Sequence, residues 1–518
     1  MDGGVDMEQL EQVLKDNAHN CLKVGTFSAA SNITGVLSDT TAISIMLHKH
    51  NALAFFDFAA AGPYIPLEMN PHVPGPEGSL AYKDAIFLSP HKMVGGVATP
   101  GVLVVKRSIA KRFCSGVPPT QPGGGTVRYV FESDHLYVDS LEEREEGGTP
   151  DIVGAVRCAL AFRLKAAVGP ARIAACEASH WALLRGLLEA HPGVRILGNT
   201  ACPRLAIASL VIRHGARYLH HNFVAALLND LFGIQARAGC ACAGPYAFGL
   251  LGMHGEAGAA LRSALRQGDE LSKPGFVRLG AAYFMSAAAV RFLAAALVFV
   301  AEHGWRLLPL YAARPRSVEW RHRAAPAEPD QRPGLAGLCF GAPPPPPPPC
   351  MEGGAAADEA AWATYLSAAL AAAEAAARAA AEDEGLAARL AAEETAGEGW
   401  LTSAEGRRLR WFLLPSEAAA RLRAGGASAP PPPLPPPGHT AFYADDDAVG
   451  GRDAEDELER SEARTVRAPR GRRRGAPRKG RAAPLAARHG AGRRALTAFV
   501  MLARRGRVAG RDRPVVHA

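Results

Sequence analysis

Two runs of proline limit where this chain can build a compact core. The first covers 343–349, and the second covers 430–437 with a single leucine inside it. Proline runs adopt an extended polyproline II conformation and act as stiff spacers. We therefore expect a globular body that ends near residue 312, a Pro-rich linker over 313–350, and a separate folded segment before the second run.

Composition supports a folded body and places the positive charge in the tail. The chain has 518 residues, 48% of them hydrophobic, so it is long enough to bury a sizeable core. The formal net charge is +8, yet residues 464–518 hold 17 lysines and arginines against one acid. The remainder is therefore net negative, which does not support a basic, nucleic-acid-binding body.

The segment between the proline runs is predicted to form a helical appendage over 351–423. It is dominated by Ala, Glu, Leu and Arg, which favour helices. One helical face carries large apolar residues, namely Trp362, Tyr365, Leu366 and Leu370. With the apolar run at 410–415, this face should dock on the globular body. Residues 424–518 are expected to be a disordered basic tail, and RNA or DNA binding by the tail is a weaker alternative.

Within 1–312, short apolar runs alternate with helical patterns, which indicates an α/β fold. The strand-like runs cover 52–56, 85–88, 101–105, 194–197 and 206–212. The helical patterns cover 151–168, 173–188 and 223–231. We expect a large domain over 1–148 with a mainly parallel sheet, and a smaller α/β domain over 149–312.

The chain shows no secretory or transit pattern in its first 22 residues. The most apolar window, 281–301, carries Arg291 near its middle and is more typical of a buried helix than of a membrane span. Nine cysteines are spread thinly along the chain, which predicts reduced thiols in an intracellular protein. We expect a cytoplasmic protein with no membrane contact and no metal site.

Polar side chains follow two of the predicted strands, where ligands of open α/β sheets bind. Asp57 ends one apolar run, and Ser89, His91 and Lys92 directly follow another. Taken singly, Asp57 is compatible with a strand-end cap and Lys92 with a solvated surface amine. The unbroken string over 84–96, Asp-Ala-Ile-Phe-Leu-Ser-Pro-His-Lys-Met-Val-Gly-Gly, is more specific.

This string resembles the Schiff-base segment of the class V aminotransferase group of pyridoxal-phosphate enzymes, which includes cysteine desulfurases and selenocysteine lyases. The resemblance implies that Lys92 carries the cofactor. It also implies that Ser89 and His91 hold the phosphate, that Asp57 pairs with the pyridine nitrogen, that Thr99 reaches a phosphate across a subunit interface, and that Asn32 lies near the phenolic oxygen. The implied fold is fold type I, usually as a homodimer.

Four further motifs follow in the family's order, at 123–127, 145–150, 237–245 and 273–278. By the resemblance, Arg278 binds the substrate carboxylate, as a planar guanidinium can; the alternative is a structural salt bridge. Cys242 falls where desulfurases carry the cysteine that receives sulfur, and Arg237 precedes it by five residues. A packing role for Cys240 and Cys242, or a weak metal-binding pair, is the alternative.

The chain also departs from the family pattern. Ala60 replaces a glutamine that contacts the cofactor in many members, and residues 1–31 contain no Gly-Thr phosphate loop and no histidine placed to stack on the ring. We expect either the front part of the large domain to be missing or a degenerate member.

The resemblance implies an enzyme that binds pyridoxal 5'-phosphate, acts on an amino acid and, in the desulfurase case, passes sulfur to an acceptor. A catalytically inactive scaffold or partner subunit is the alternative.

Overall fold

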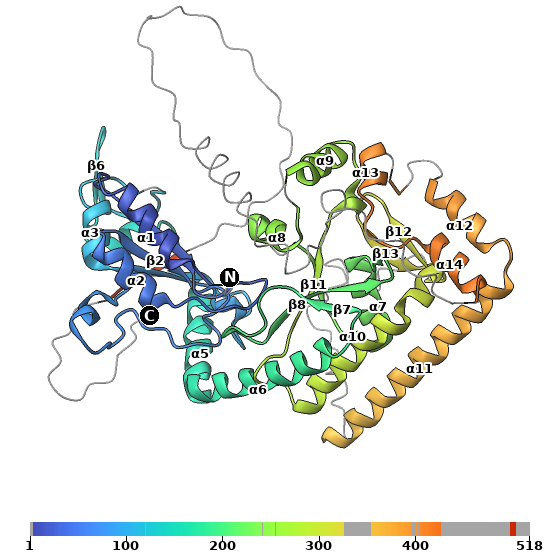
Figure 1. Ribbon diagram of the computed structural model, residues 1–518. Helices are drawn as coiled ribbons and strands as arrows, with labels where there is room; N and C mark the ends of the chain where they lie inside the picture. The colour runs from blue at the N-terminus through green and yellow to red at the C-terminus, as the bar shows by residue number, and fades with distance from the viewer. Residues whose placement is uncertain are drawn as a thin grey trace, which may run out of the picture.

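The computed structural model describes residues 4–119, 121–240, 242–253, 255–325, 354–395, 400–401, 403–425 and 498–503. Figure 1 shows an N-terminal α/β unit, a second α/β unit, and a group of helices on the far side of the second unit. Most of the expected Pro-rich linker and nearly all of the expected disordered tail lie outside the described residues.

The first unit is built on a five-stranded sheet. Its strands are β1 (Val24–Ser28), β2 (Leu53–Asp57), β3 (Ala85–Leu88), β4 (Gly101–Lys106) and β14 (Ala498–Ala503), in that spatial order. Only the β3–β4 pair is antiparallel. Short apolar strands such as β2, β3 and β4 are typical of a mainly parallel sheet. The sheet places the ends of β2 and β3 side by side, with Asp57 paired to Phe87.

Helices and short turns surround this sheet. They are α1 (Met7–Asp16), α2 (Thr40–Lys49), α3 (Arg107–Cys114), α4 (Leu141–Glu145) and the 3-10 turns η1 (Pro76–Leu80) and η2 (Pro90–Lys92), with a hairpin of β5 (Val127–Val130) and β6 (His135–Tyr137). Asp6 and Asp39 cap α1 and α2 by accepting backbone N–H bonds.

The second unit contains an antiparallel sheet in the order β10-β11-β8-β7. Its elements are α6 (Pro170–Glu189), β7 (Val194–Ile196), β8 (Ile207–His214), β9 (Arg217–Tyr218), α7 (His221–Phe232), β10 (Arg237–Gly239), α8 (Gly244–Leu250), α9 (Gly255–Arg266), η3 (Glu270–Ser272), β11 (Phe276–Gly280) and α10 (Ala287–Leu307). After the turn η4 (Leu308–Leu310), β12 (Tyr311–Arg314) and β13 (Glu319–His322) form a hairpin.

The packing places the unit boundaries later than the sequence suggests. Helix α5 (Ile152–Val168) buries Cys158 in the core of the first unit, whereas α6 buries its apolar face in the core of the second. The change of partner therefore comes at Gly169, which has φ +89°, and not near 148. The second unit also continues past 312, because Trp320 of β13 is buried in its core.

One helix among the described residues, Ala287–Leu310, is long and apolar enough to cross a membrane, and half of its most apolar stretch is buried. Helix α10 packs against α6, α7 and the appendage helix α11 (Gly354–Glu382). This arrangement is that of a core helix, as the sequence predicts.

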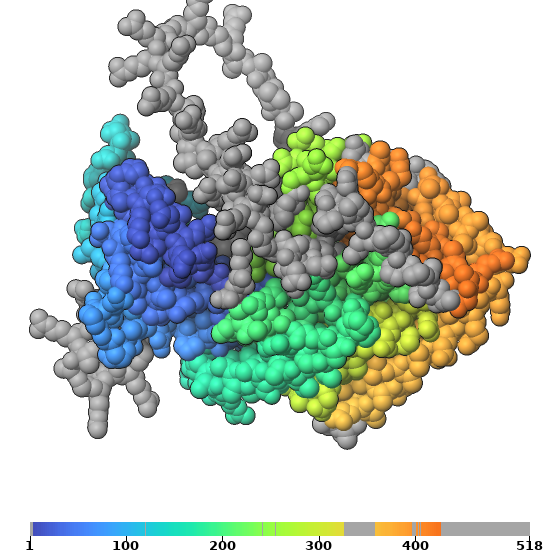
Figure 2. Space-filling model, viewed as in Figure 1, coloured from blue at the N-terminus to red at the C-terminus, as the bar shows by residue number. Residues whose placement is uncertain are grey.

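The appendage, residues 354–423, packs on the second unit (Figures 1 and 2). It consists of α11, α12 (Leu386–Thr395), α13 (Ala404–Arg408) and α14 (Pro415–Arg423). Small side chains let α11 approach closely, namely Ala369, Ala373, Ala376 and Ala380, all buried. Trp362 stacks on Phe292 with ring centroids 5.1 Å apart. The run 410–415 extends along β9, where Leu413 N donates to Tyr218 O at 2.9 Å.

Candidate active site

Lys92 lies at the carboxyl end of β3, on the turn η2. Lys92 N donates to Ser89 O at 3.0 Å, and the turn then closes on Gly96. A Cβ atom at Gly96 would lie 2.0 Å from Pro90 O, so only glycine fits there. The string over 89–96 therefore builds one tight turn that holds Lys92 at the sheet edge.

Charged groups from three parts of the chain act on Lys92. Burial lowers the pKa of the Lys92 ammonium, Asp57 opposes this shift, and Arg278 and Arg237 add to it. Asp57 reaches this position because β2 pairs with β3, and its Oδ1 also accepts from Ala59 N at 2.7 Å. Asp57 thus forms the local cap that its sequence position allows and, in addition, acts electrostatically on Lys92.

Arg237 and Arg278 face each other as register partners on β10 and β11. Arg278 Nη1 donates to Asn32 O at 2.7 Å, which ties β11 to a loop of the first unit. Burial lowers the pKa of the Arg278 guanidinium, and the neighbouring Arg237 lowers it further. Among the described residues Arg278 forms no ion pair with an acid, so the structural salt bridge is not observed there.

Cys242 lies beside Arg237, whose Nη2 donates to Cys242 Sγ at 3.0 Å. Both residues are exposed, and Cys242 has φ +65°, an unusual conformation for a side chain with a Cβ atom. Strained backbone of this kind occurs often at functional sites. Within the described part of the chain, which includes Cys240 and Cys242, no group of three or more His, Cys, Asp or Glu could hold a metal.

A cavity of about 640 Å³ lies between the two units. Its polar lining residues include Asn32, Lys92, Arg237 and Arg278. Its apolar lining residues include Ile234, Met285, Phe292 and Leu293. The cavity is therefore suited to a small molecule that carries a carboxylate and an apolar part.

The remaining predicted site residues lie outside the cavity lining. Ser89 and His91 share the turn of Lys92, with Ser89 half-buried and His91 exposed. Thr99 is buried, and its Oγ1 has no hydrogen-bond partner within the described residues. Asp57 and Cys242 are not part of the cavity wall, but both lie close enough to Lys92 to act on it electrostatically. Ala60, the departure from the family pattern, does line the cavity.

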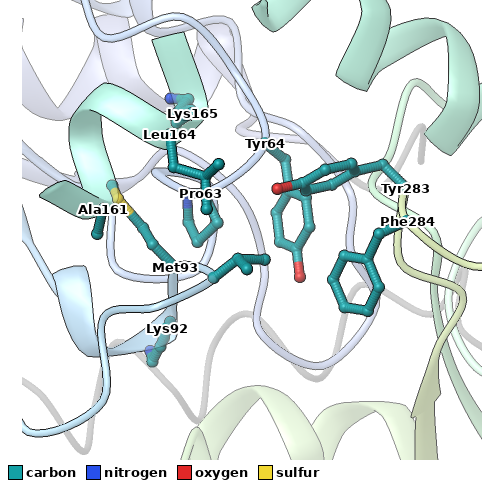
Figure 3. Close-up of a pocket in the computed structure, with 10 residues that line it drawn as sticks. Pro63, Tyr64, Lys92, Met93, Ala161, Leu164, Lys165, Tyr283 and Phe284 are labelled. Carbon is teal, nitrogen blue, oxygen red and sulfur yellow. The ribbon is translucent and has the colours of Figure 1, made fainter. Parts of the chain in front are cut away.

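Sequence reasoning missed a pair of half-buried tyrosines that line a pocket together with Lys92, shown in Figure 3. Tyr64 and Tyr283 meet edge to face with ring centroids 6.5 Å apart. Burial, with Glu177 and Tyr283 nearby, raises the pKa of the Tyr64 hydroxyl to about 12, so it stays a hydrogen-bond donor. A single tyrosine outside any motif gives no sequence signal.

Lys165 fixes the loop that carries Tyr64. Its Nζ donates to Gly62 O at 2.6 Å and to Ile65 O at 2.5 Å, and burial lowers the pKa of Lys165 to about 8. A signal for Lys165 does exist, because it continues the buried face of α5 after Gly154, Cys158 and Ala161. The large apolar residues of α5 recur at helical spacing on the opposite, exposed face, so the sequence pattern predicts burial of that face instead.

The residues present fit pyridoxal phosphate. The lysine with a lowered pKa, the acid on the neighbouring strand end and the buried, unpartnered hydroxyl of Thr99 are the kinds of group that such a cofactor needs. Ser89 adds a second hydroxyl on the turn of Lys92.

Comparisons with known proteins point to one family. The family model "Aminotransferase class-V" matches residues 1–288, more than half of the chain. A "Probable cysteine desulfurase" of Staphylococcus aureus (strain Mu50 / ATCC 700699) is 28% identical over 244 residues, which are 47% of this chain and 53% of that protein. The "Probable cysteine desulfurase 2" of Mycobacterium leprae (strain TN) is 27% identical over 244 residues, or 47% of this chain and 52% of that one.

The chain spans about half the length of the curated relatives it matches. Among solved structures, it is similar to the apo cysteine desulfurase from Thermococcus onnurineus NA1, with a TM-score of 0.44 and 22% identity over 58% of this chain and 64% of that one. The family match extends through the string at Lys92, the loop of Cys242 and the strand of Arg278. The chain therefore belongs to the class V aminotransferase family, with the α/β architecture of fold type I that its sequence predicts.

Proposed function

We propose that this chain is a pyridoxal-phosphate-dependent enzyme that removes sulfur from cysteine. The observation that carries the proposal is the hydrogen bond from Arg237 to Cys242 Sγ, in a group of charges that also includes Lys92 and Arg278. A lysine, a carboxylate-binding arginine and a thiol are the protein groups that such a reaction requires.

The cofactor, when bound, supplies an electron sink for the substrate carbon atoms. By the family resemblance, Lys92 would hold it and Asp57 would face its ring nitrogen. Ser89, His91 and Thr99 would contact its phosphate, and Asn32 would lie near its phenolic oxygen.

Arg278 binds the carboxylate of the substrate in this proposal. The guanidinium keeps one N–H on Asn32 O, and its other N–H groups remain to face the cavity. Arg237 adds a second positive charge at the same end. The lowered pKa of Lys92 increases its neutral fraction, so its amine accepts a proton from the substrate more readily than a lysine of ordinary pKa does.

Cys242 takes the sulfur. Its thiolate attacks the sulfur of bound cysteine, an S–S bond forms, the carbon–sulfur bond breaks, and the bonding electron pair stays with carbon. Lys92 returns a proton to the carbon atom that lost the sulfur, and the substrate leaves as alanine. The persulfide on Cys242 then passes its sulfur to a thiol acceptor.

The test is turnover of L-cysteine by the chain with added pyridoxal phosphate and dithiothreitol, measured as alanine and sulfide. We expect Cys242→Ser to abolish both products and Cys240→Ser, at an equally exposed position two residues away, to retain them. Equal loss in both variants, or no product from the unmodified chain, would contradict the proposal.

We also propose that the protein is a homodimer. The outer face of α5 carries an exposed apolar stripe, with Ile152 64%, Val156 57% and Leu160 56% exposed. The stripe adjoins the Lys92 turn, because Arg157 Nη1 donates to Val97 O at 2.8 Å. Contiguous exposed apolar patches mark protein interfaces, and a second copy covering this stripe would lie near Thr99, two residues from Val97.

A further inference from the structure

The appendage touches the segment that carries three of the proposed functional residues. Arg237 and Cys242 stand at the start of this segment and Arg278 at its end, with α8, α9 and η3 between them. The family match stops at residue 288, so the appendage, residues 354–423, is an addition to the matched part. Figure 1 shows α13 beside α9 and α14 beside α12.

The first contact joins α13 to the turn before η3. Ser403 donates to Asp269 Oδ2 through its backbone N at 3.0 Å and through its hydroxyl, and Asp269 is 2% exposed. A Cβ atom at Gly406 would lie 2.1 Å from Asp269 Oδ2, so the glycine permits this close approach. The contact fixes the appendage at residues 269–272.

The second contact is made by Trp411. Its indole Nε1 donates to Ser272 O at 3.2 Å, and the side chain is buried. The same ring stacks on His221, with centroids 5.7 Å apart and planes 6° apart. Burial lowers the pKa of His221 to about 3, so the imidazole is neutral at working pH and contributes packing, not charge.

His221 in turn packs against residues that adjoin the strands of the site. A Cβ atom at Gly275 would lie 2.8 Å from His221 Cε1 and 3.0 Å from Gly239 Cα, so Gly275 packs closely against the imidazole and against Gly239. Gly275 precedes β11 and Gly239 ends β10. Each glycine is three residues from a proposed functional side chain, Arg278 in one case and Cys242 in the other.

We propose that Trp411 of the appendage is a positioning residue that, through His221 and Gly275, sets the separation of β10 and β11 and hence the placement of Arg237, Cys242 and Arg278. The catalytic consequence rests on the proposed function above. The geometric claim concerns the two strands alone, so it can be tested without cofactor or substrate.

The experiment compares three variants of the full chain. Trp411→Leu removes the stack and the bond to Ser272, whereas Trp411→Phe keeps an aromatic ring and loses only the bond. Trp400→Leu is the matched control, because Trp400 is an equally buried indole of the same region that packs on Trp320 of β13. The measurements are site-resolved iodoacetamide labelling of Cys242, with exposed Cys21 as internal reference, and hydrogen exchange of 237–245 and 273–280.

We expect Trp411→Leu to change the Cys242 labelling rate by about threefold or more, in line with coupling through packed side chains, and to speed exchange in both segments. Trp411→Phe, which keeps the stack and loses the bond to Ser272, should label Cys242 at close to the wild-type rate and speed exchange only at 273–280. Trp400→Leu should leave Cys242 unchanged. Equal effects of Trp400→Leu and Trp411→Leu, or no effect of Trp411→Leu, would overturn the proposal.

If Trp411→Leu does not fold, Trp411→Phe decides: faster exchange confined to 273–280 supports the proposal, and unchanged exchange overturns it. Kinetics with L-cysteine separate this inference from the proposed function. If the chain does not turn over cysteine but Trp411→Leu changes labelling and exchange, only the proposed function is contradicted. If the chain turns over cysteine and Trp411→Leu changes neither, only the positioning role of Trp411 is contradicted.

Discussion

Arg278 combines two tasks at the site. One of its N–H groups binds Asn32 O at 2.7 Å, and the guanidinium lines the cavity beside Lys92. A planar guanidinium can hold a backbone oxygen and a carboxylate at once, whereas an ammonium is a point charge with different geometry. In the proposed function, Arg278 therefore links the loop of Asn32 to substrate binding.

This geometry makes Arg278→Lys informative. We expect KM for the amino acid to rise about 10- to 100-fold with a smaller change in kcat, since charge-assisted hydrogen bonds contribute about 1.5–3 kcal/mol. Steady-state kinetics would show the split. An unchanged KM would mean that the carboxylate binds elsewhere.

Lys165 gives a prediction about stability. Lys165→Met removes the bonds to Gly62 O and Ile65 O and leaves both oxygens without this donor. We expect the free energy of unfolding to fall by about 1–3 kcal/mol, measured by urea denaturation. Lys111→Met, at an exposed lysine of α3, should change it by less than about 0.5 kcal/mol. Equal effects would show that the Lys165 bonds add no stability.

Helix α5 shows how one element can serve two purposes. Its small residues, Lys165 and Phe162 face the first unit, whereas Ile152, Val156, Leu160 and Leu164 face outward. Hydrophobic periodicity alone predicts the reverse, because it assigns the largest side chains to the core of the same chain. A partner that covers the outer face accounts for both patterns.

Leu160→Glu should therefore weaken the proposed dimer. A buried carboxylate without a partner is costly, so we expect a monomer in sedimentation velocity where the unmodified chain is a dimer. Ala174→Glu on the exposed side of α6 is the control and should stay dimeric. A wild-type chain that sediments as a monomer at all concentrations tested would contradict the dimer.

His221, in the first turn of α7, is expected to make the stability of the fold depend on pH. Burial lowers the pKa of His221 from 6.5 to about 3, so between these values the unfolded chain binds more protons than the folded one. Stability is fully present above pH 6.5 and falls as pH drops below it, by about 2 kcal/mol for this group at pH 5. Urea unfolding at pH 7.5 and pH 5 should show a smaller loss in His221→Phe than in wild type. Equal losses would mean that His221 is not held neutral by the fold.

At the scale of the whole molecule, local motifs were predictable and long-range packing was not. The string over 84–96 and the strands at 53–57 and 85–88 depend on neighbours in sequence, and the structure has them within a residue or two. The antiparallel order β10-β11-β8-β7 and the contact of Trp411 with Ser272 join residues that are far apart in the chain. Hydrophobic periodicity in the sequence does not show which distant residues contact each other.

The residues of the candidate site also fall into those that the sequence predicts and those that it does not. Lys92, Asp57, Arg237, Cys242 and Arg278 were found from motifs, and the structure brings their charges together. Tyr64 was not found, because a single side chain outside a motif carries no pattern. The later boundary at Gly169 follows from which core each helix contacts, and composition cannot show this.

The most direct test of the account is to identify which lysine holds pyridoxal phosphate. The full chain is incubated with the cofactor, reduced with borohydride and digested, and the modified lysine is located by mass spectrometry. We predict a stoichiometric pyridoxyl adduct at Lys92 that is lost in Lys92→Ala, while exposed Lys111 stays unmodified. No adduct at Lys92, or modification spread evenly over exposed lysines, would contradict the account.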